Sequence, residues 1–353
     1  MAEQDSIWAL GLMSGTSLDG VDAALIRTDG EDVYDVGPAV MIEYAPEARA
    51  TIRAVLGCEK GLESAEAVVT DYHRKAVVAL LAETDVKPAV IGFHGQTILH
   101  EPGKRKTVQL GDGAKLAVVT GIDVVNDFRS ADVAAGGQGA PFAPLYHAAL
   151  ARDLTPPLVV LNIGGVGNVT WIGNEVIAFD TGPGNALMDD LILRKADRKF
   201  DRGGNLAASG QADQARVETW LSRPYFTQRP PKSLDRDEFV DCTVDDLTLA
   251  DGLATLAEFT VASIQAGVRH FPSPAKRWLV SGGGRHNDHL MTELRARLTL
   301  PVEPVEAVSW RGDAVEAEAF GYLAVRSIRG LPLSLPSTTG VPVAMTGGRL
   351  NKA

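Results

Sequence analysis

The residues whose types and spacing point most directly to chemistry lie in the run FDTGPGNALMDDLIL, from Phe179 to Leu193. An apolar strand is predicted to end at Asp180, and the turn that follows leads into a helix. A carboxylate at the carboxyl end of a strand lies where α/β proteins bind their ligands. The helix dipole favours the ionised carboxylate, which a general base requires. We therefore interpret Asp180 as a candidate catalytic base, with a purely turn-capping role as the structural alternative.

Small residues form further segments that could bind an anion or a nucleotide. Ile7–Leu10 and Val21–Ile26 are predicted to pair as a hairpin with SGTS, residues 14–17, at its tip. Backbone N–H groups of such residues can approach a phosphate closely. The pattern returns in LVVLNIGGVGNVTWI, and a triple glycine after a later strand leaves room for adenine and ribose. Plain tight turns remain the alternative. The candidate residues of these two later segments are Gly164, Gly165, Asn168, Gly282, Gly283 and Gly284.

Polar side chains follow two other predicted strands. His94 and Gln96 come directly after a short buried strand and suit a ligand with amide or hydroxyl groups, with a structural hydrogen-bonding role for His94 as the alternative. Arg129 lies three residues before Asp132 and just ahead of a glycine-rich stretch. Its guanidinium could clamp a carboxylate or a sugar substituent through paired hydrogen bonds. A surface ion pair between Arg129 and Asp132 is the structural alternative.

The last predicted helix, Asp313–Ile328, carries an acid on its apolar face. Glu316 shares that face with Ala319, Phe320 and Leu323. An acid in this position is costly unless it meets a partner or a ligand. Glu318 is a rival candidate, and a solvated helix edge is a further alternative.

Composition narrows the class of protein. The 353 residues suffice for two domains, and 45% hydrophobic with 22% charged residues is typical of a globular protein. A net charge of -11 argues against a nucleic-acid or acidic-membrane partner. We find no signal peptide and no membrane-spanning stretch, and we expect a cytoplasmic enzyme. The histidines form no convincing metal set, so the expected metal is Mg²⁺ bound by carboxylate and phosphate.

These residues must be positioned by alternating strands and helices, which predict an α/β fold. Asp112 is predicted to cap a helix that Gly121 ends. The second lobe is predicted to begin near Gly136–Pro144. The expected division is residues 1–133 plus about 312–353 in the first lobe, and 134–311 in the second. The proline-rich, charged run Ser222–Glu238 is expected to be a surface loop. Neither a G-x-x-x-x-G-K-[ST] nor a strand–G-x-G-x-x-G–helix pattern is present, which disfavours P-loop and Rossmann enzymes.

Taken together, these segments resemble the anhydro-N-acetylmuramic acid kinases, of the superfamily of sugar kinases, actin and large heat-shock ATPases. The resemblance spans nearly the whole chain, in order, through GLMSGTSLDGVD, FHGQTILHEP, NDFRSADVAAGGQGAPF, LNIGGVGNVT, DTGPGNALMDD, PYFTQRPPKS, SGGGRHNDHLM and DAVEAEAF. It implies two actin-like (ribonuclease H-like) lobes of mixed sheets flanked by helices, with a cleft between them. It also implies a homodimer that acts on a cell-wall-derived sugar in the bacterial cytoplasm.

The resemblance also implies a reaction and residue roles. ATP, water and 1,6-anhydro-N-acetylmuramic acid would give N-acetylmuramic acid 6-phosphate and ADP. Asp180 matches the base that activates water, and Glu316 matches a sugar-side carboxylate, while His94, Gln96 and Arg129 fall in segments near the sugar. The matched ATP phosphate segment comprises Gly15, Thr16, Ser17, Leu18, Asp19, Gly20, Val21 and Asp22. Asp22 is the candidate ligand of Mg²⁺.

The sequence departs from the family pattern at two places. Phe93 precedes His94 where relatives tend to carry a small polar residue, and SLDRDEF follows PPK where relatives show a Ser-Thr-Gly-Arg-Glu run. We therefore assign no ligand role to the Ser222–Glu238 segment. The alternative functions are an ordinary amino-sugar or hexose kinase of the same superfamily, and a non-catalytic nucleotide switch of the actin or chaperone type.

Overall fold

The computed structural model of the chain describes residues 5–15 and 17–353. It divides into two compact units, residues 1–153 with 314–353 and residues 154–313. The stretch Gly136–Pro144, where the sequence places the start of the second lobe, lies in the first unit. Among the described residues, no helix has the length and apolar character needed to cross a membrane.

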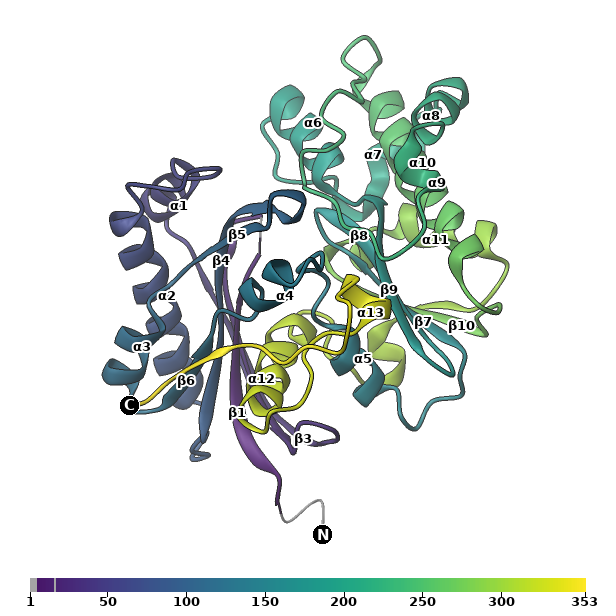
Figure 1. Ribbon diagram of the computed structural model, residues 1–353. Coiled ribbons are helices and arrows are strands. Elements are labelled where there is room, and N and C mark those ends of the chain that lie inside the picture. Colours follow the sequence, from purple (N-terminus) through teal and green to yellow (C-terminus); the bar gives the residue numbers. More distant parts are fainter. Residues whose placement is uncertain (1–4, 16) are drawn as a thin grey trace. The chain divides into compact units, whose positions relative to one another are not determined.

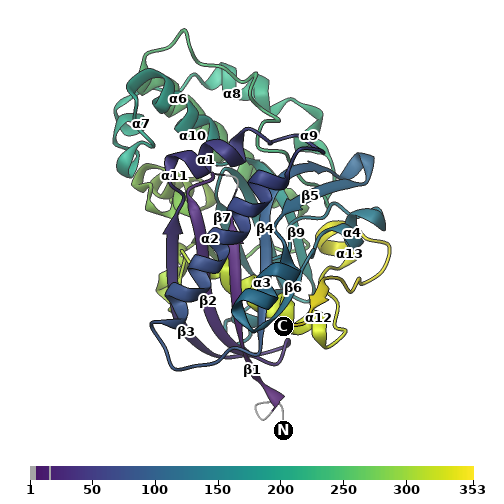
Figure 2. The same cartoon turned by 90° about the vertical axis from the view of Figure 1, so that its left-hand side faces the viewer.

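The first unit is built on a seven-stranded mixed sheet in the order β12-β6-β4-β1-β2-β3, with β5 pairing with β4. Its strands are β1 (Ile7–Ser14), β2 (Gly20–Thr28), β3 (Val33–Glu43), β4 (Val90–Glu101), β5 (Lys106–Leu110), β6 (Asp123–Asn126) and β12 (Arg349–Asn351). Its α-helices are α1 (Pro46–Arg53), α2 (Glu63–Leu81), α3 (Gly113–Thr120), α4 (Ser130–Ala134), α5 (Pro144–Leu150), α12 (Val315–Ile328) and α13 (Pro336–Thr339). Figure 1 shows α2 and α3 on one side of this sheet and α12 on the other, and Figure 2 shows α2 lying along the sheet.

The second unit is built on a five-stranded mixed sheet in the order β11-β10-β7-β8-β9. Its strands are β7 (Leu158–Ile163), β8 (Val166–Ile172), β9 (Val176–Pro183), β10 (Arg277–Ser281) and β11 (Val302–Pro304). Its α-helices are α6 (Ala186–Ala196), α7 (Asn205–Ser209), α8 (Gln214–Leu221), α9 (Pro224–Thr227), α10 (Leu249–Gly267) and α11 (Asp288–Leu298). The long helix α10 packs on β9 and against α6, α7, α8 and α11.

The two sheets repeat one topology. In the first, β1 pairs antiparallel with β2 and parallel with β4, and β4 pairs parallel with β6. In the second, β7 pairs antiparallel with β8 and parallel with β10, and β10 pairs parallel with β11. The predicted hairpins are therefore the first two strands of each sheet. The predicted class, α/β with two mixed sheets flanked by helices, is confirmed.

Local sequence signals explain why the elements begin and end where they do. The central strand β1 is almost continuously apolar because helices cover both faces of the sheet. Helix α2 buries one stripe, which includes Val69, Ala76 and Leu80. The predicted caps of α3 are confirmed: the Asp112 carboxylate accepts from the Lys115 amide, and Gly121 adopts a left-handed φ of 68°.

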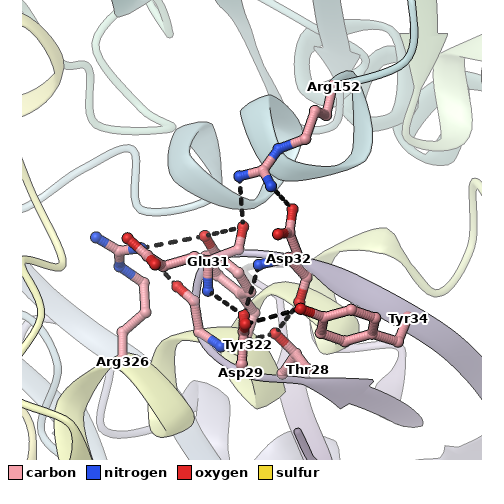
Figure 3. Close-up of polar contacts among 9 residues, drawn as sticks. Thr28, Asp29, Glu31, Asp32, Tyr34, Arg152, Tyr322 and Arg326 are labelled. Carbon is pink, nitrogen blue, oxygen red and sulfur yellow. Dashed lines mark hydrogen bonds and ion pairs between the residues drawn. The ribbon is translucent and has the colours of Figure 1, made fainter. Parts of the chain in front are cut away.

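A polar network fixes the turn between β2 and β3 (Figure 3). The Asp29 carboxylate accepts from the Glu31 and Asp32 amides and from the Tyr34 hydroxyl. Arg326 of α12 donates to the Gly30 carbonyl at 2.6 Å. Arg152, close to the chain's passage into the second unit, forms an ion pair with Asp32. The network thus joins this turn to α12 and to the end of the segment that contains α5.

Candidate active site

In the second unit, the predicted residues gather at one edge of the sheet. Strands β7, β9 and β10 run in the same direction, because β7 and β9 both pair antiparallel with β8 and β10 pairs parallel with β7. Their carboxyl ends therefore meet at one edge. Gly164 and Gly165 follow β7, Gly282 follows β10, and Asp180 lies near the end of β9.

A row of polar residues crosses the sheet at this edge. Ser281 of β10 is in register with Asn162 of β7, Asn162 with Asn168 of β8, and Asn168 with Asp180 of β9. Directly paired residues point to the same face of a sheet. The structure thus places the candidate base and Asn168 side by side, on the same face as two further hydrogen-bonding side chains.

Asp180 is held by the segment that the sequence assigned to a surface loop. The Asp180 amide donates to the Lys232 carbonyl at 3.0 Å, and the Tyr225 hydroxyl donates to the Asp180 carbonyl at 2.6 Å. The Leu234 amide donates to Asp180 Oδ2 at 2.8 Å. Asp180 is 7% exposed and Lys232 is 3% exposed. The segment therefore packs against the candidate base, and sequence reasoning missed it although PYFTQRPPKS belongs to the resemblance.

Asn185 connects the turn after Asp180 to the glycine segments. Its amide donates to the Gly164 carbonyl at 2.8 Å, and its side-chain Nδ2 donates to the Ile163 carbonyl at 3.1 Å. The Gly282 carbonyl accepts from the buried guanidinium of Arg285 at 3.0 Å. Neither Asn185 nor Arg285 was identified as a site residue from the sequence. A side chain that fixes a backbone turn leaves no distinctive spacing.

Space around the glycines separates those that the fold requires from those that it does not. An added Cβ at Gly282 or Gly284 would overlap Asn162 or Ile163, and one at Gly20 would overlap the Ile42 carbonyl. At Gly15, Gly164 and Gly283 an added Cβ would meet no atom among those compared closer than 3.8 Å, and none of the three has a left-handed φ. Packing within the protein therefore does not require glycine at these three positions.

In the first unit, residues outside the hairpin hold its tip, between β1 and β2, in place. Leu18 is buried with a left-handed φ of 57°, and its carbonyl accepts from Arg49 of α1 at 2.8 Å. The Asp19 carbonyl accepts from the Tyr44 amide at 2.9 Å. Ser17 and Asp19 are exposed, and Asp22 is half-buried on β2 opposite Met13. Thr16, also predicted in this segment, lies outside the described residues.

The side chain of Gln96 supports this hairpin tip through a hydrogen bond with Ser14. Its side chain is fully buried, with Oε1 accepting from the Ser14 hydroxyl at 2.5 Å and Nε2 donating to the Thr97 carbonyl at 3.1 Å. The Ser14 hydroxyl also lies 3.0 Å from that of Tyr44. The contacts of Gln96 thus connect the carboxyl end of β1 with the middle of β4.

His94 and Arg129 are in direct contact. His94 Nδ1 donates to the Gly95 carbonyl at 2.8 Å, so that Nε2 accepts from Arg129 Nε at 3.0 Å. Burial, and then the Arg129 charge, hold the pKa of His94 well below its ordinary value. Arg129 also donates through Nη1 to the Gly139 carbonyl at 2.5 Å. A neutral histidine therefore orients the guanidinium.

Asp132 does not form the surface ion pair considered above. It is 2% exposed, and its carboxylate accepts from the Gly139 amide at 2.7 Å and the Thr339 hydroxyl at 2.6 Å. The Ser334 hydroxyl is a third donor. Asp132 thus fixes the glycine loop whose Gly139 carbonyl binds Arg129.

A cavity of about 250 Å³ opens beside His94 within the first unit. It is lined in part by Gly95, Gly111, Asn126, Asp127 and Arg349. Gly95 lies within β4 and Gly111 follows β5, while Asn126 and Asp127 lie at the carboxyl end of β6 and Arg349 begins β12. Asp127 adopts a left-handed φ of 54°, a strained conformation that occurs at functional sites.

The two acids of α12 have different surroundings. Glu318 is 2% exposed, and its Oε2 accepts from the Tyr146 hydroxyl at 2.8 Å. Glu316 is exposed in the first turn of the helix, so its predicted place on the buried apolar face is wrong and the alternative of a solvated helix edge is confirmed. This turn packs beside Met13 at the end of β1 through Ala314 and Ala317. Glu316 therefore lies near the carboxyl edge of the first sheet.

No group of three potential metal-binding residues occurs within residues 5–15 and 17–353. Mg²⁺ that accompanies a nucleotide is commonly held by one or two carboxylates and by phosphate oxygens. The half-buried carboxylate of Asp22, near the hairpin tip, has the donor chemistry that such a site needs.

Comparison with known structures gives alignments at low sequence identity and with TM-scores below 0.5. The activator of 2-hydroxyisocaproyl-CoA dehydratase from Clostridium difficile with bound ADPNP aligns at a TM-score of 0.47 and 11% identity, over 92% of this chain and 96% of that one. A ROK family glucokinase from Streptomyces griseus in complex with glucose and AMPPNP aligns at 0.42 and 13%, over 90% and 99%.

Comparison with known sequences gives much closer relatives. An anhydro-N-acetylmuramic acid kinase of Rhodospirillum rubrum is 54% identical over 351 residues, 97% of this chain and 94% of the relative. One of Acidiphilium cryptum is 53% identical over 354 residues, 97% of each chain. The family model described as anhydro-N-acetylmuramic acid kinase matches residues 7–352. The chain therefore belongs to the anhydro-N-acetylmuramic acid kinase family.

Proposed function

We propose that this chain opens 1,6-anhydro-N-acetylmuramic acid with water and phosphorylates O6 with ATP, which gives N-acetylmuramic acid 6-phosphate and ADP. The observation that carries the proposal is the placement of Asp180. Its carboxylate is held by the Leu234 amide at the carboxyl edge of the second sheet, in register with Asn168. Membership of the family supports the substrate.

The proposed steps assign one proton transfer to Asp180. The carboxylate takes a proton from water as the water oxygen bonds to C1 of the sugar. The C1–O6 bond breaks, O6 forms a bond to the γ-phosphorus, and ADP leaves with the electrons of the broken P–O bond. Since O6 departs to phosphorus, the leaving oxygen does not need a strong acid, unlike ordinary glycoside hydrolysis.

The remaining residues bind and orient the reactants. We assign Gly15–Asp22, Gly164, Gly165, Asn168 and Gly282–Gly284 to ATP. We assign His94, Gln96, Arg129 and Glu316 to the sugar, with Gln96 acting through Ser14. Mg²⁺ would be held by Asp22 and would neutralise charge on the transferred phosphoryl group.

The test combines product analysis with one variant. Native enzyme, ATP and the anhydro sugar should yield a product heavier by one water and one phosphoryl group, with oxygen from labelled water at C1. D180N should lose nearly all turnover while its melting temperature stays near that of the native protein. A product that gains only a phosphoryl group would indicate an ordinary sugar kinase. Nucleotide hydrolysis without any sugar product would indicate a nucleotide switch.

We also propose that the enzyme acts as a homodimer in the bacterial cytoplasm. The family resemblance implies this state, and the negative net charge gives no attraction to nucleic acid or acidic membranes. Sedimentation equilibrium at several protein concentrations tests the dimer, and a single monomeric species would contradict it.

A further inference from the structure

The segment from Pro224 to Leu234 encloses Asp180 on its backbone and on its side chain. The Tyr225 hydroxyl binds the Asp180 carbonyl, the Lys232 carbonyl binds the Asp180 amide, and the Leu234 amide binds Oδ2. The first contact lies at one end of the segment and the other two at the opposite end. Contacts that hold these two ends together therefore help to fix the position of the carboxylate.

Lys232 joins the two ends of the segment. Its Nζ donates to the Tyr225 carbonyl at 2.9 Å and lies 4.3 Å from the centre of the Tyr225 ring. The Phe179 ring of β9 lies 5.8 Å away. The lysine thus bridges the segment and packs against the strand that carries Asp180.

Burial of an ammonium group is costly unless it is paired. A lysine this deeply buried is therefore expected to have a nearby anion or a functional role. Arg269 and His270 are the other basic groups facing it, and the Tyr225 hydroxyl is neutral because burial raises its pKa. Asp180 is the carboxylate whose charge interacts with Lys232. Burial, with a smaller contribution from Arg269, lowers the pKa of Lys232 to about 8, and Asp180 opposes this shift. The ammonium therefore remains largely charged near neutral pH.

We propose that Lys232 is a positioning residue for the reaction: its ammonium holds the Pro224–Leu234 segment closed around Asp180 and stabilises the ionised carboxylate. This inference rests on the proposed role of Asp180 as the base. Lys232 itself touches neither the water nor the sugar in this role. It acts through the Leu234 amide and through its charge.

Two matched variants separate the electrostatic role from a merely structural one. K232M removes the charge and the bridge while keeping the length of the side chain. Y225F removes the hydroxyl that binds the Asp180 carbonyl but leaves the Lys232 charge and its bond to the Tyr225 carbonyl in place. Both proteins are measured for kcat and KM with ATP and anhydro-N-acetylmuramic acid from pH 5 to 9, and for melting temperature.

We expect K232M to lower kcat by about 10- to 100-fold with little change in either KM, since the carboxylate is misplaced but the substrates are still bound. The acidic limb of its kcat profile should move to higher pH, because the carboxylate has lost a nearby cation. Y225F should lower kcat without moving that limb. A K232M enzyme with native kcat, or with reduced kcat and an unmoved acidic limb, overturns the proposal.

D180N distinguishes a wrong assignment of the base from a wrong role for Lys232. If D180N is inactive and K232M has the native profile, the proposed base stands and the role of Lys232 is wrong. If D180N turns over at the native rate, both are wrong. Should K232M fail to fold, K232R serves in its place: it keeps the charge, so its acidic limb must coincide with the native one even where kcat falls, and a displaced limb overturns the proposal.

Discussion

At the scale of single residues, neighbouring glycines that look equivalent in the sequence have different reasons to be glycine. Gly282 has a left-handed φ of 75°, and an added Cβ would overlap the Asn162 side chain. Gly283 is exposed, with an open space where a Cβ would lie. Gly20 and Gly15 form a similar pair in the first unit, since only Gly20 is crowded by a neighbouring strand. The fold requires glycine at the crowded member of each pair, whereas packing does not require it at the open member.

This difference predicts that one added methyl group impairs ATP binding at Gly283 and protein stability at Gly282. G283A should keep the native melting temperature and raise the KM for ATP by about 10-fold, or ~1.4 kcal/mol of binding free energy. G282A should destabilise the protein by about 1–3 kcal/mol, because alanine at a left-handed φ is strained. Thermal melts and ATP titrations of both variants test the pair. Native ATP kinetics in G283A would argue that the nucleotide does not approach this glycine.

At the scale of elements, α12 depends on close contact with two strands. An added Cβ at Gly92 of β4 would overlap the Phe320 carbonyl, and one at Gly11 of β1 would overlap the Ala317 carbonyl. The helix backbone therefore rests almost directly on the sheet. Because Glu316 lies in the first turn of α12, this contact also fixes the position of the proposed sugar-side carboxylate.

We expect G92A to cost about 2–3 kcal/mol of unfolding free energy, because the rigid backbone of α12 must move away from β4. G103A is the matched control: no atom lies within 4 Å of its added Cβ, and its φ is not left-handed. It should change stability by less than about 0.5 kcal/mol. Urea unfolding of both variants gives the comparison, and equal midpoints would contradict the close packing of α12.

The same elements show what the sequence could predict. The hairpins, the caps of α3 and the strand before Asp180 follow from residues near one another in the chain. The bond between Leu234 and Asp180 does not, because 54 residues separate its partners. Gly136–Pro144 reads as a linker, yet Asp132 and Thr339 bind it to the first unit through Gly139 and Gln138. Contacts of this range depend on tertiary packing, which leaves no period in the sequence.

At the scale of the whole molecule, each unit has its own hydrophobic core. One buried cluster includes Leu10, Val69 and Ile91, and another includes Leu161, Phe259 and Val280. The chain passes between the units at residues 153–154 and 313–314. The stability of the two cores can therefore depend on pH in different ways.

The first unit buries three histidines in their neutral form. Burial lowers the pKa of His73 and of His147 to about 4 each, and burial with the Arg129 charge lowers the pKa of His94 well below its ordinary value. His73 Nδ1 donates to the Val69 carbonyl at 2.7 Å, and its Nε2 has no hydrogen-bond partner in the part of the chain that the structure describes. An unfolded histidine binds a proton near pH 6.5. Between pH 6.5 and 4 the unfolded chain thus binds more protons than the folded one, and stability is lost as the pH falls.

We therefore expect acid to open the first unit partly through these histidines. H73L removes one of them, which should make the loss of stability between pH 7 and 4.5 smaller by at most about 3 kcal/mol. Hydrogen exchange of α2 peptides, corrected for the intrinsic rate at each pH, measures the opening free energy in both proteins. Peptides from α10 provide the reference in the second unit. Equal losses of stability in H73L and native protein over this range would contradict the prediction. In that case His73 is already protonated in the folded state, or its burial does not oppose protonation. Burial of this histidine would then not account for the pH dependence of the first unit.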